Sequence, residues 1–256
     1  MKFSSLTVFT SAAALVALVG CGGASAPASS AAVTPVSSTP APTAAKGGDI
    51  TGVIKFDGTA PAATPIKMAG DAYCAGAGKG QMTDEYAVKD GKIANVFVYL
   101  KEGVDLSKVP AADMNSGATI DQHGCWYSPH VLGLRVGQKL TIKNSDTTMH
   151  NIHGMGDGDL SFNDAMPAGT AAKEHTFSAP AMGVKIKCDV HSWMGAWANV
   201  MEHPWYAVSN ADGSFAILNV PPGKYTLHAW HEKMGEQTTE VTVTATGAVA
   251  ELTFKK

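Results

Sequence analysis

The sequence has no block of positive charge and few charged residues of either sign. Charged residues make up 16% of its 256 residues, and the formal net charge is −3. A nucleic-acid-binding surface needs clustered Lys and Arg, and so does attachment to an anionic membrane through charge. We therefore expect no nucleic-acid partner and no lipid surface bound by electrostatics.

Long apolar segments are also missing, apart from one near the amino terminus. The run from Leu6 to Val19 follows Lys2 and is too short to span a bilayer comfortably. It ends in Leu-Val-Gly-Cys, which resembles a bacterial lipobox. These features predict a lipoprotein signal peptide over residues 1–21, with Cys21 as the lipid-bearing first mature residue. The alternative is an ordinary signal peptide with a chance cysteine.

The next segment lacks large side chains. Residues 22–48 are mostly Ala, Ser, Pro and Thr, so they cannot bury enough apolar surface to order themselves. We expect a tether whose ends lie roughly 30 Å apart as a coil. It would hold the chain at the periplasmic face of a bacterial membrane. Gly22 after the cysteine, by resemblance to proteobacterial lipoproteins, slightly favours the outer membrane.

Cysteine is scarce, and its count is informative. Beyond the amino-terminal region the chain has Cys74, Cys125 and Cys188. In an oxidising compartment an odd number indicates one disulfide and one thiol with a separate role. Cys188 lies among other metal-binding residue types, so Cys74 and Cys125 are the expected pair. Two separate buried cysteines, or a second metal site with His123, Cys125 and His130, are the alternatives.

No segment shows the apolar stripe of a long helix. Short runs of β-branched and aromatic residues occur instead, separated by Gly, Pro, Asn and Asp. Alternation over 184–188 places Val184, Ile186 and Cys188 on one inward face of a strand. Short strands at this spacing predict an all-β fold, either a sandwich or a barrel.

Four side chains make up a copper ligand set. Cys188, His191 and Met194 lie on one short segment, and His150 lies upstream. Two imidazoles and a thiolate in a plane, with a thioether at a long axial distance, form a blue-copper site. The residues therefore predict one copper ion. Zinc is the main competitor, but a thioether is a poor zinc ligand.

Residues 118–202 resemble a cupredoxin, and most of all amicyanin. The resemblance rests on a short Cys-x2-His-x2-Met loop and on a His-Asn-x-His segment, which are here residues 188–194 and 150–153. It implies a Greek-key β-sandwich that holds one type 1 copper ion. It also implies that His150, rather than His153, is the upstream ligand.

Two residues beside the ligands are expected to support the site. Asn151 is placed to hydrogen-bond across to the loop of the cysteine ligand, as metal sites require. Asp189 stands where cupredoxins usually carry Thr or Ser, and its carboxylate would stabilise the cupric ion. By the same resemblance, the edge of His191 would be exposed, with Trp193 and Met155 in an apolar ring around it.

The flanking segments resemble two halves of a second domain. Residues 203–256 resemble the second half of a carboxypeptidase-regulatory-like β-sandwich, which is an Ig-like or transthyretin-like fold, and residues 49–117 resemble the first half. Insertion of the cupredoxin between them is tolerable because the termini of a domain often lie close together. The alternative assigns 49–117 to an extended cupredoxin and makes the tail a separate domain. The whole chain also resembles bacterial lipoproteins of the methylamine-utilisation-protein type.

Three functions are compatible with these features. The first is a membrane-tethered periplasmic electron carrier that cycles between Cu(I) and Cu(II) and meets a redox partner protein. The second is a periplasmic copper carrier or chaperone, and the third is a lipoprotein whose sandwich binds carbohydrate or protein. The electron carrier is favoured because a thiolate with an axial thioether is an electron-transfer ligand set. Four protein ligands leave no open position for a substrate, so we expect a protein that is not an enzyme. We also expect it to be a monomer.

Overall fold

The computed structural model describes residues 47–256, so the predicted signal peptide, Cys21 and nearly all of the predicted tether lie outside the described residues. Within the described part the fold is all-β, as the strand pattern predicts. Its strands form four sheets, and α1 (Ala72–Ala77) is its single α-helix. No helix among residues 47–256 is long and apolar enough to cross a bilayer.

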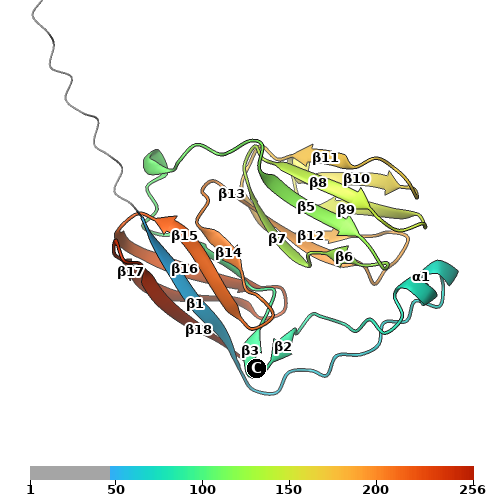
Figure 1. The fold of residues 1–256 in the computed structure, drawn as a ribbon, viewed down its shortest axis with the longest axis horizontal. Helices are drawn as coiled ribbons and strands as arrows, with labels where there is room; N and C mark the ends of the chain where they lie inside the picture. Colours follow the sequence, from blue (N-terminus) through green and yellow to red (C-terminus); the bar gives the residue numbers. More distant parts are fainter. Residues whose placement is uncertain (1–46) are drawn as a thin grey trace, which may run out of the picture. The chain divides into compact units, whose positions relative to one another are not determined.

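Two sheets come from the middle of the chain and pack around one core, and we call residues 117–201 the middle sandwich (Figure 1). Ile120 and Leu140 enter this core from one sheet, and Ile152 and Ile186 from the other. Burial alternates along most of these strands, as it does in a sheet with one face on a core. One sheet contains β11 (Lys173–Thr176), β8 (Lys139–Asn144), β5 (Gly117–Gln122) and β6 (Tyr127–Ser128). The other contains β10 (Ser161–Met166), β9 (His150–Met155), β12 (Ala181–Lys187), β13 (Gly195–Met201) and β7 (Val131–Arg135).

The other two sheets combine strands that precede and follow the middle sandwich, and we call them the split sandwich. In Figure 1, blue β1 runs beside β15 and β18 of the orange and red tail. Val53 of β1 lies opposite Ser214 on one side and Glu251 on the other. One sheet contains β1 (Gly48–Asp57), β2 (Val88–Lys89), β3 (Lys92–Ile93), β15 (Ser214–Val220) and β18 (Ala248–Lys255). The other contains β14 (Tyr206–Val208), β4 (Phe97–Leu100), β16 (Gly223–His231) and β17 (Gly235–Val243).

This strand pairing joins the two segments that the sequence assigns to halves of one domain. Ile50 and Ile54 of β1 are fully buried, and they share a core with Phe215 and Leu252 of the tail. An edge of β1 without the tail would expose both the apolar side chains and the backbone donors of the strand. The domain boundaries themselves stay a prediction.

The segment between β1 and β2 leaves the split sandwich and packs on the middle one. It contains α1, which begins after Asp71, where the Asp71 carboxylate accepts the backbone N–H of Cys74. A disulfide between Cys74 and Cys125 joins α1 to the turn before β6. This is the pair predicted from the cysteine count. Both cysteines and Met68 belong to the core of the middle sandwich, so part of the segment predicted as a first half packs on the middle sandwich.

Candidate metal centre

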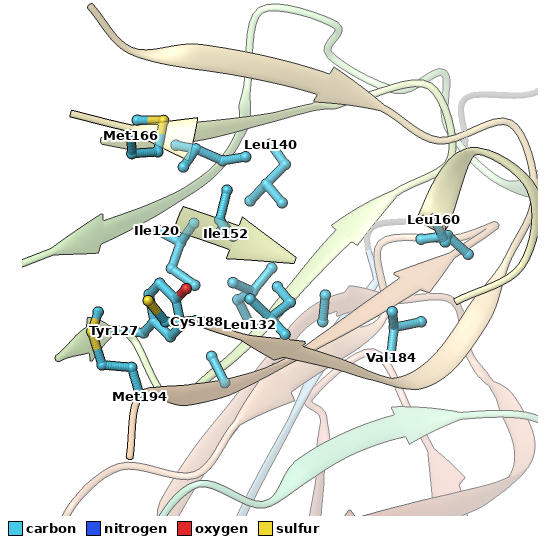
Figure 2. Close-up of a cluster of buried hydrophobic side chains, with 14 of the residues drawn as sticks. Ile120, Tyr127, Leu132, Leu140, Ile152, Leu160, Met166, Val184, Cys188 and Met194 are labelled. Atoms are coloured by element: carbon cyan, nitrogen blue, oxygen red, sulfur yellow. The ribbon is translucent and has the colours of Figure 1, made fainter. Parts of the chain in front are cut away.

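The predicted ligands meet at one end of the middle sandwich. His150 is the first residue of β9, Cys188 follows the last residue of β12, and His191 and Met194 lie on the loop to β13. All four residues are buried, with exposed fractions of 3% or less. Figure 2 shows Cys188 and Met194 at the end of the core that lies opposite Leu160.

The donor atoms of three of these side chains converge. Nδ1 of His150 lies 2.9 Å from Nδ1 of His191, which lies 3.9 Å from Sγ of Cys188. The ligand atoms of the three residues all lie within 4.8 Å of one another. A single small ion with bonds of about 2.0–2.3 Å to nitrogen and sulfur spans such a triangle. The arrangement therefore fits a copper ion held by two imidazoles and a thiolate.

Met194 closes the loop that carries two of the ligands. Its backbone N–H donates to the carbonyl of His191 at 3.0 Å, and its carbonyl accepts the N–H of Cys188 at 3.3 Å. The backbone N–H of His191 points at Sγ of Cys188, 3.3 Å away. The Met194 side chain lies in the same buried core cluster as Cys188. The turn thus fixes Cys188 relative to His191 and keeps a thioether at the same end of the core.

Two carboxylates orient the imidazoles, and neither was predicted from the sequence. Nε2 of His150 lies 2.9 Å from Oδ2 of Asp146, and Nε2 of His191 lies 3.3 Å from Oδ2 of Asp71. When the ring protons are on Nε2 and donate to these carboxylates, the lone pairs are on Nδ1. Both Nδ1 atoms then offer their lone pairs where Cys188 offers its sulfur.

Asp146 is fully buried and accepts several hydrogen bonds. Its carboxylate accepts the backbone N–H groups of Gly124 and Cys125, each at 2.8 Å, and the hydroxyl of Tyr73 at 3.0 Å. Burial alone would raise the pKa of Asp146, but these hydrogen bonds and the one from His150 hold that pKa below its usual value. Gly124 and Cys125 have φ values of 64° and 56°, which turn consecutive N–H groups toward one anion.

The neutral form of His150 is favoured by its surroundings. Burial lowers the pKa of His150 below its ordinary value, although the hydrogen bond and charge of Asp146 act in the opposite direction. A neutral imidazole is the form that binds a metal ion. Asp146 lies four residues before His150, so this short spacing is the signal by which sequence reasoning would have found it.

The exposed His191 edge implied by the cupredoxin resemblance is not found in the described residues, and that expectation is wrong. His191 is only 3% exposed. Sγ of Cys74 lies 3.8 Å from its Nε2, and the ring centroid of Trp193 lies 5.0 Å from that of the imidazole. Trp193 also donates its indole N–H to the carbonyl of Cys125 at 3.1 Å. His191 is covered because the segment between β1 and β2 brings α1 over it. Met155, the other residue expected beside an exposed histidine edge, is exposed on β9.

The hydrogen bond expected from Asn151 is present. Its Oδ1 accepts the backbone N–H of Asp189 at 2.5 Å, which ties β9 to the residue after the cysteine ligand. The Asp189 carboxylate is bound by Lys187 at 2.7 Å, His153 at 2.9 Å and Asn163 at 2.9 Å. These partners, Lys187 above all, hold the pKa of Asp189 far below its usual value. They also offset its charge, so we expect less stabilisation of a cupric ion than the sequence alone indicates.

The second metal site considered from the sequence is not formed in the described residues. Cys125 is in the disulfide, so it offers no thiolate. His130 is paired instead with Glu232 and, at 3.4 Å, with Asp84. Asp84, His130 and Glu232 line a cleft of about 590 Å³ that also borders Met194 of the candidate centre.

Comparison with protein families gives one partial match. A family model described as polysaccharide lyase family 4, domain II, matches residues 174–251, which is less than half of the chain. No curated protein sequence matches the chain.

Similar solved structures include a nitrite reductase, a cupredoxin and an amicyanin. A copper-containing nitrite reductase from Thermus scotoductus is 20% identical with a TM-score of 0.31, over 38% of this chain, which spans only 26% of the reductase. A purple cupredoxin from Nitrosopumilus maritimus is 26% identical with a TM-score of 0.28, over 32% of this chain and 98% of its own. Amicyanin from Paracoccus versutus is 16% identical with a TM-score of 0.29, over 40% of this chain and 96% of its own. Each likeness covers less than half of this chain.

Proposed function

We propose that this chain is a membrane-tethered electron carrier of the bacterial periplasm with one type 1 copper ion on His150, Cys188, His191 and Met194. The observation that supports it best is the convergence of two Nδ1 atoms and one Sγ at a buried strand end. Together with a nearby thioether, these donors make up the ligand set of electron-transfer copper sites. The proposed lipid on Cys21 and the proposed tether are supported by the sequence alone.

The chain's own residues would keep the ligands in one geometry. When bound, copper supplies a one-electron couple between Cu(I) and Cu(II). Asp146 holds the ring of His150, and the hydrogen bonds of the loop hold Cys188 next to His191. Because the ligands are buried, water is excluded from the ion, and the coordination geometry is set by the protein and not by the solvent.

An electron carrier is favoured over an enzyme and over a copper chaperone by this burial. A substrate would need an open coordination position and a route to the metal ion. A chaperone would need ligands that a partner can reach, whereas each predicted ligand is at most 3% exposed. A redox partner protein would meet α1 rather than a bare histidine edge. Ala72, Ala75 and Gly76 are exposed there, and their small side chains permit close approach.

The test is the spectrum of the copper-loaded full chain with its disulfide intact. We expect an intense visible thiolate-to-copper band in the cupric state, which Cys188→Ala abolishes. His150→Ala should weaken the band or convert the site to another type, while the matched control His153→Ala should leave it in place. A cupric wild-type protein without this band would contradict the proposal.

A further inference from the structure

A second group of donor atoms lies on the outer side of His191, away from Cys188. Nε2 of His191 has Oδ2 of Asp71 at 3.3 Å and Sγ of Cys74 at 3.8 Å. The ligand atoms of these three residues all lie within 4.8 Å of one another. Sγ of Cys125 is bonded to Sγ of Cys74, so it becomes the fourth donor atom of the group once that bond is broken. In the disulfide form neither sulfur carries the charge that a metal ion requires.

We propose that reduction of the Cys74–Cys125 disulfide creates a second metal site, which binds Cu(I) or Zn(II) through Cys74, Cys125, His191 and Asp71. Both ions have a filled d shell and accept tetrahedral or lower coordination by thiolate and imidazole. The site uses neither Cys188 nor the Met194 thioether. It therefore goes beyond the electron carrier and does not depend on it.

The chemistry of opening the site is a thiol–disulfide exchange. A dithiol reductant attacks the disulfide, supplies two electrons and two protons, and leaves as a disulfide, while Cys74 and Cys125 become thiols. Metal binding then releases the two thiol protons to solvent. The ring proton of His191 moves from Nε2 to Nδ1, where Nδ1 of His150 accepts it in a hydrogen bond; these two atoms are 2.9 Å apart.

The electrostatics of the dithiol form favour a bound cation. Cys74 and Cys125 are both fully buried, and a buried thiolate without a counter-charge is costly. Asp71 lies beside one sulfur, and Asp146 is grouped with the other, with its ligand atom within 4.8 Å. Because the two thiols lose their protons only as a metal ion binds, the ion both forms bonds to the thiolates and offsets their repulsion with the two carboxylates.

His191 belongs to both sites through opposite ring nitrogens. A neutral imidazole has one lone pair, so His191 binds the inner ion through Nδ1 or the outer ion through Nε2, but not both at once. An ion at the outer site is thus one imidazole ring away from the inner site and competes with it. The outer site is a station for metal entry or removal that oxidation of the two cysteines closes.

The test uses the full chain with Cys188→Ala, which removes the inner thiolate. Affinities for Cu(I) alone and for Zn(II) alone are measured by competition with a chromophoric chelator, before and after reduction of the disulfide. We expect at least one ion to bind with a clearly lower dissociation constant after reduction, because two thiolate ligands are gained. The control Cys188→Ala/Cys74→Ser/Cys125→Ser should show no gain. Equal affinity of the disulfide and dithiol forms for both ions would overturn the proposal.

A second measurement identifies the ligands directly. In the reduced Cys188→Ala protein, bound metal should protect Cys74 and Cys125 together from alkylation, as read by peptide mapping. Alkylation at the same rate with and without metal would overturn the proposal. If circular dichroism shows that Cys188→Ala is unfolded, the isosteric Cys188→Ser takes its place with the same readings.

The two metal sites are separable in these experiments. If the wild-type protein is blue but its Cys188→Ala variant gains no metal affinity on reduction, only the proposal of the outer site is overturned. If the cupric wild type is colourless but the Cys188→Ala variant gains metal affinity on reduction, only the proposal of an electron carrier is overturned.

Discussion

The middle and split sandwiches both bury histidines, but they use them differently. In the split sandwich, Nε2 of His203 donates to the carbonyl of Leu100 at 2.9 Å and Nδ1 accepts the N–H of Trp205 at 3.2 Å. Both ring nitrogens are therefore taken by the backbone. In the middle sandwich, Nε2 of His150 and of His191 faces a carboxylate, and their Nδ1 atoms face each other. Burial alone does not mark a metal ligand: His150 and His191 differ from His203 because their Nδ1 atoms are free of backbone partners and converge with Sγ of Cys188.

The two sandwiches also differ in how much of the chain they need. The core of the split sandwich takes strands from both sides of the middle one. The candidate metal centre takes three of its predicted ligands from the segment after β12 and the fourth from β9. Only its cover, with Asp71 and Cys74, comes from the segment that precedes the middle sandwich. The ligands are therefore local to one sandwich, and access to them depends on the other segment.

The largest effect that would sharpen this comparison is expected from deletion of residues 203–256. The deletion removes β15 and β18, two of the three strands that pair with β1, so Ile50 and Ile54 lose the core that they share with the tail. We expect the first segment to lose its protection against hydrogen exchange, while a fragment of residues 118–202 still folds and takes up copper. Hydrogen exchange of β1 that is unchanged by the deletion would show that the tail is an independent appendage.

Loss of the disulfide should affect the middle sandwich more than the split one. The bond closes a separation of 51 residues and lies in the core beside the ligands. Replacement of Cys74 and Cys125 by Ser should destabilise the middle sandwich by about 2–4 kcal/mol and make His191 accessible to a histidine-modifying reagent. Denaturant unfolding and peptide mapping measure the two effects. Modification of His191 at the wild-type rate would mean that α1 stays in place without the bond.

The split sandwich should carry the clearer response to acid. His231 is 2% exposed, and burial lowers its pKa to about 4. In the unfolded chain His231 takes up a proton near pH 6.5, whereas in the folded chain it stays neutral until about pH 4. The stabilisation that the neutral buried ring gives the folded state is therefore fully present above pH 6.5 and is lost as the pH falls toward 4. Between pH 7 and 4.5 we expect a loss of about 2–3 kcal/mol of unfolding free energy from this group.

The control for that response is His231→Gln, which has no proton to take up. Urea unfolding of both proteins across the same pH range isolates the contribution of His231, because the other histidines are common to both. Parallel stability curves for the two proteins would exclude a lowered pKa of His231 as the cause.

The smallest expected effect concerns the buried carboxylate beside His150. Asp146→Asn keeps the size of the side chain but removes the charge that orients the imidazole and favours the cupric ion. We expect copper affinity to fall by roughly 10- to 100-fold and the reduction potential to rise. Asp189→Asn is a matched control at the surface, where Lys187 offsets the carboxylate, and it should shift the potential less. An equal shift of the reduction potential in both variants would show that Asp146 affects the copper ion no more than a surface carboxylate does.

Much of the centre was readable from the sequence because its parts are local. Alternation along β12 places Cys188 inward, and the spacing to His191 and Met194 fits one tight turn. Asn151 follows its neighbouring ligand directly and makes the hydrogen bond that its position suggests. The all-β class follows from the same short alternating runs. Backbone geometry fixes such relations over a few residues, whatever the rest of the chain does.

The cover of the centre was decided only by the tertiary structure. Asp71 lies 120 residues before His191 along the chain, yet their side chains meet. No periodicity or spacing links them, because that contact depends on where the segment after β1 packs once both sandwiches are formed. The sequence by itself determined which atoms are available to bind a metal ion. The packing of distant segments determined that His191 is covered and that the Cys74–Cys125 disulfide lies on its outer side.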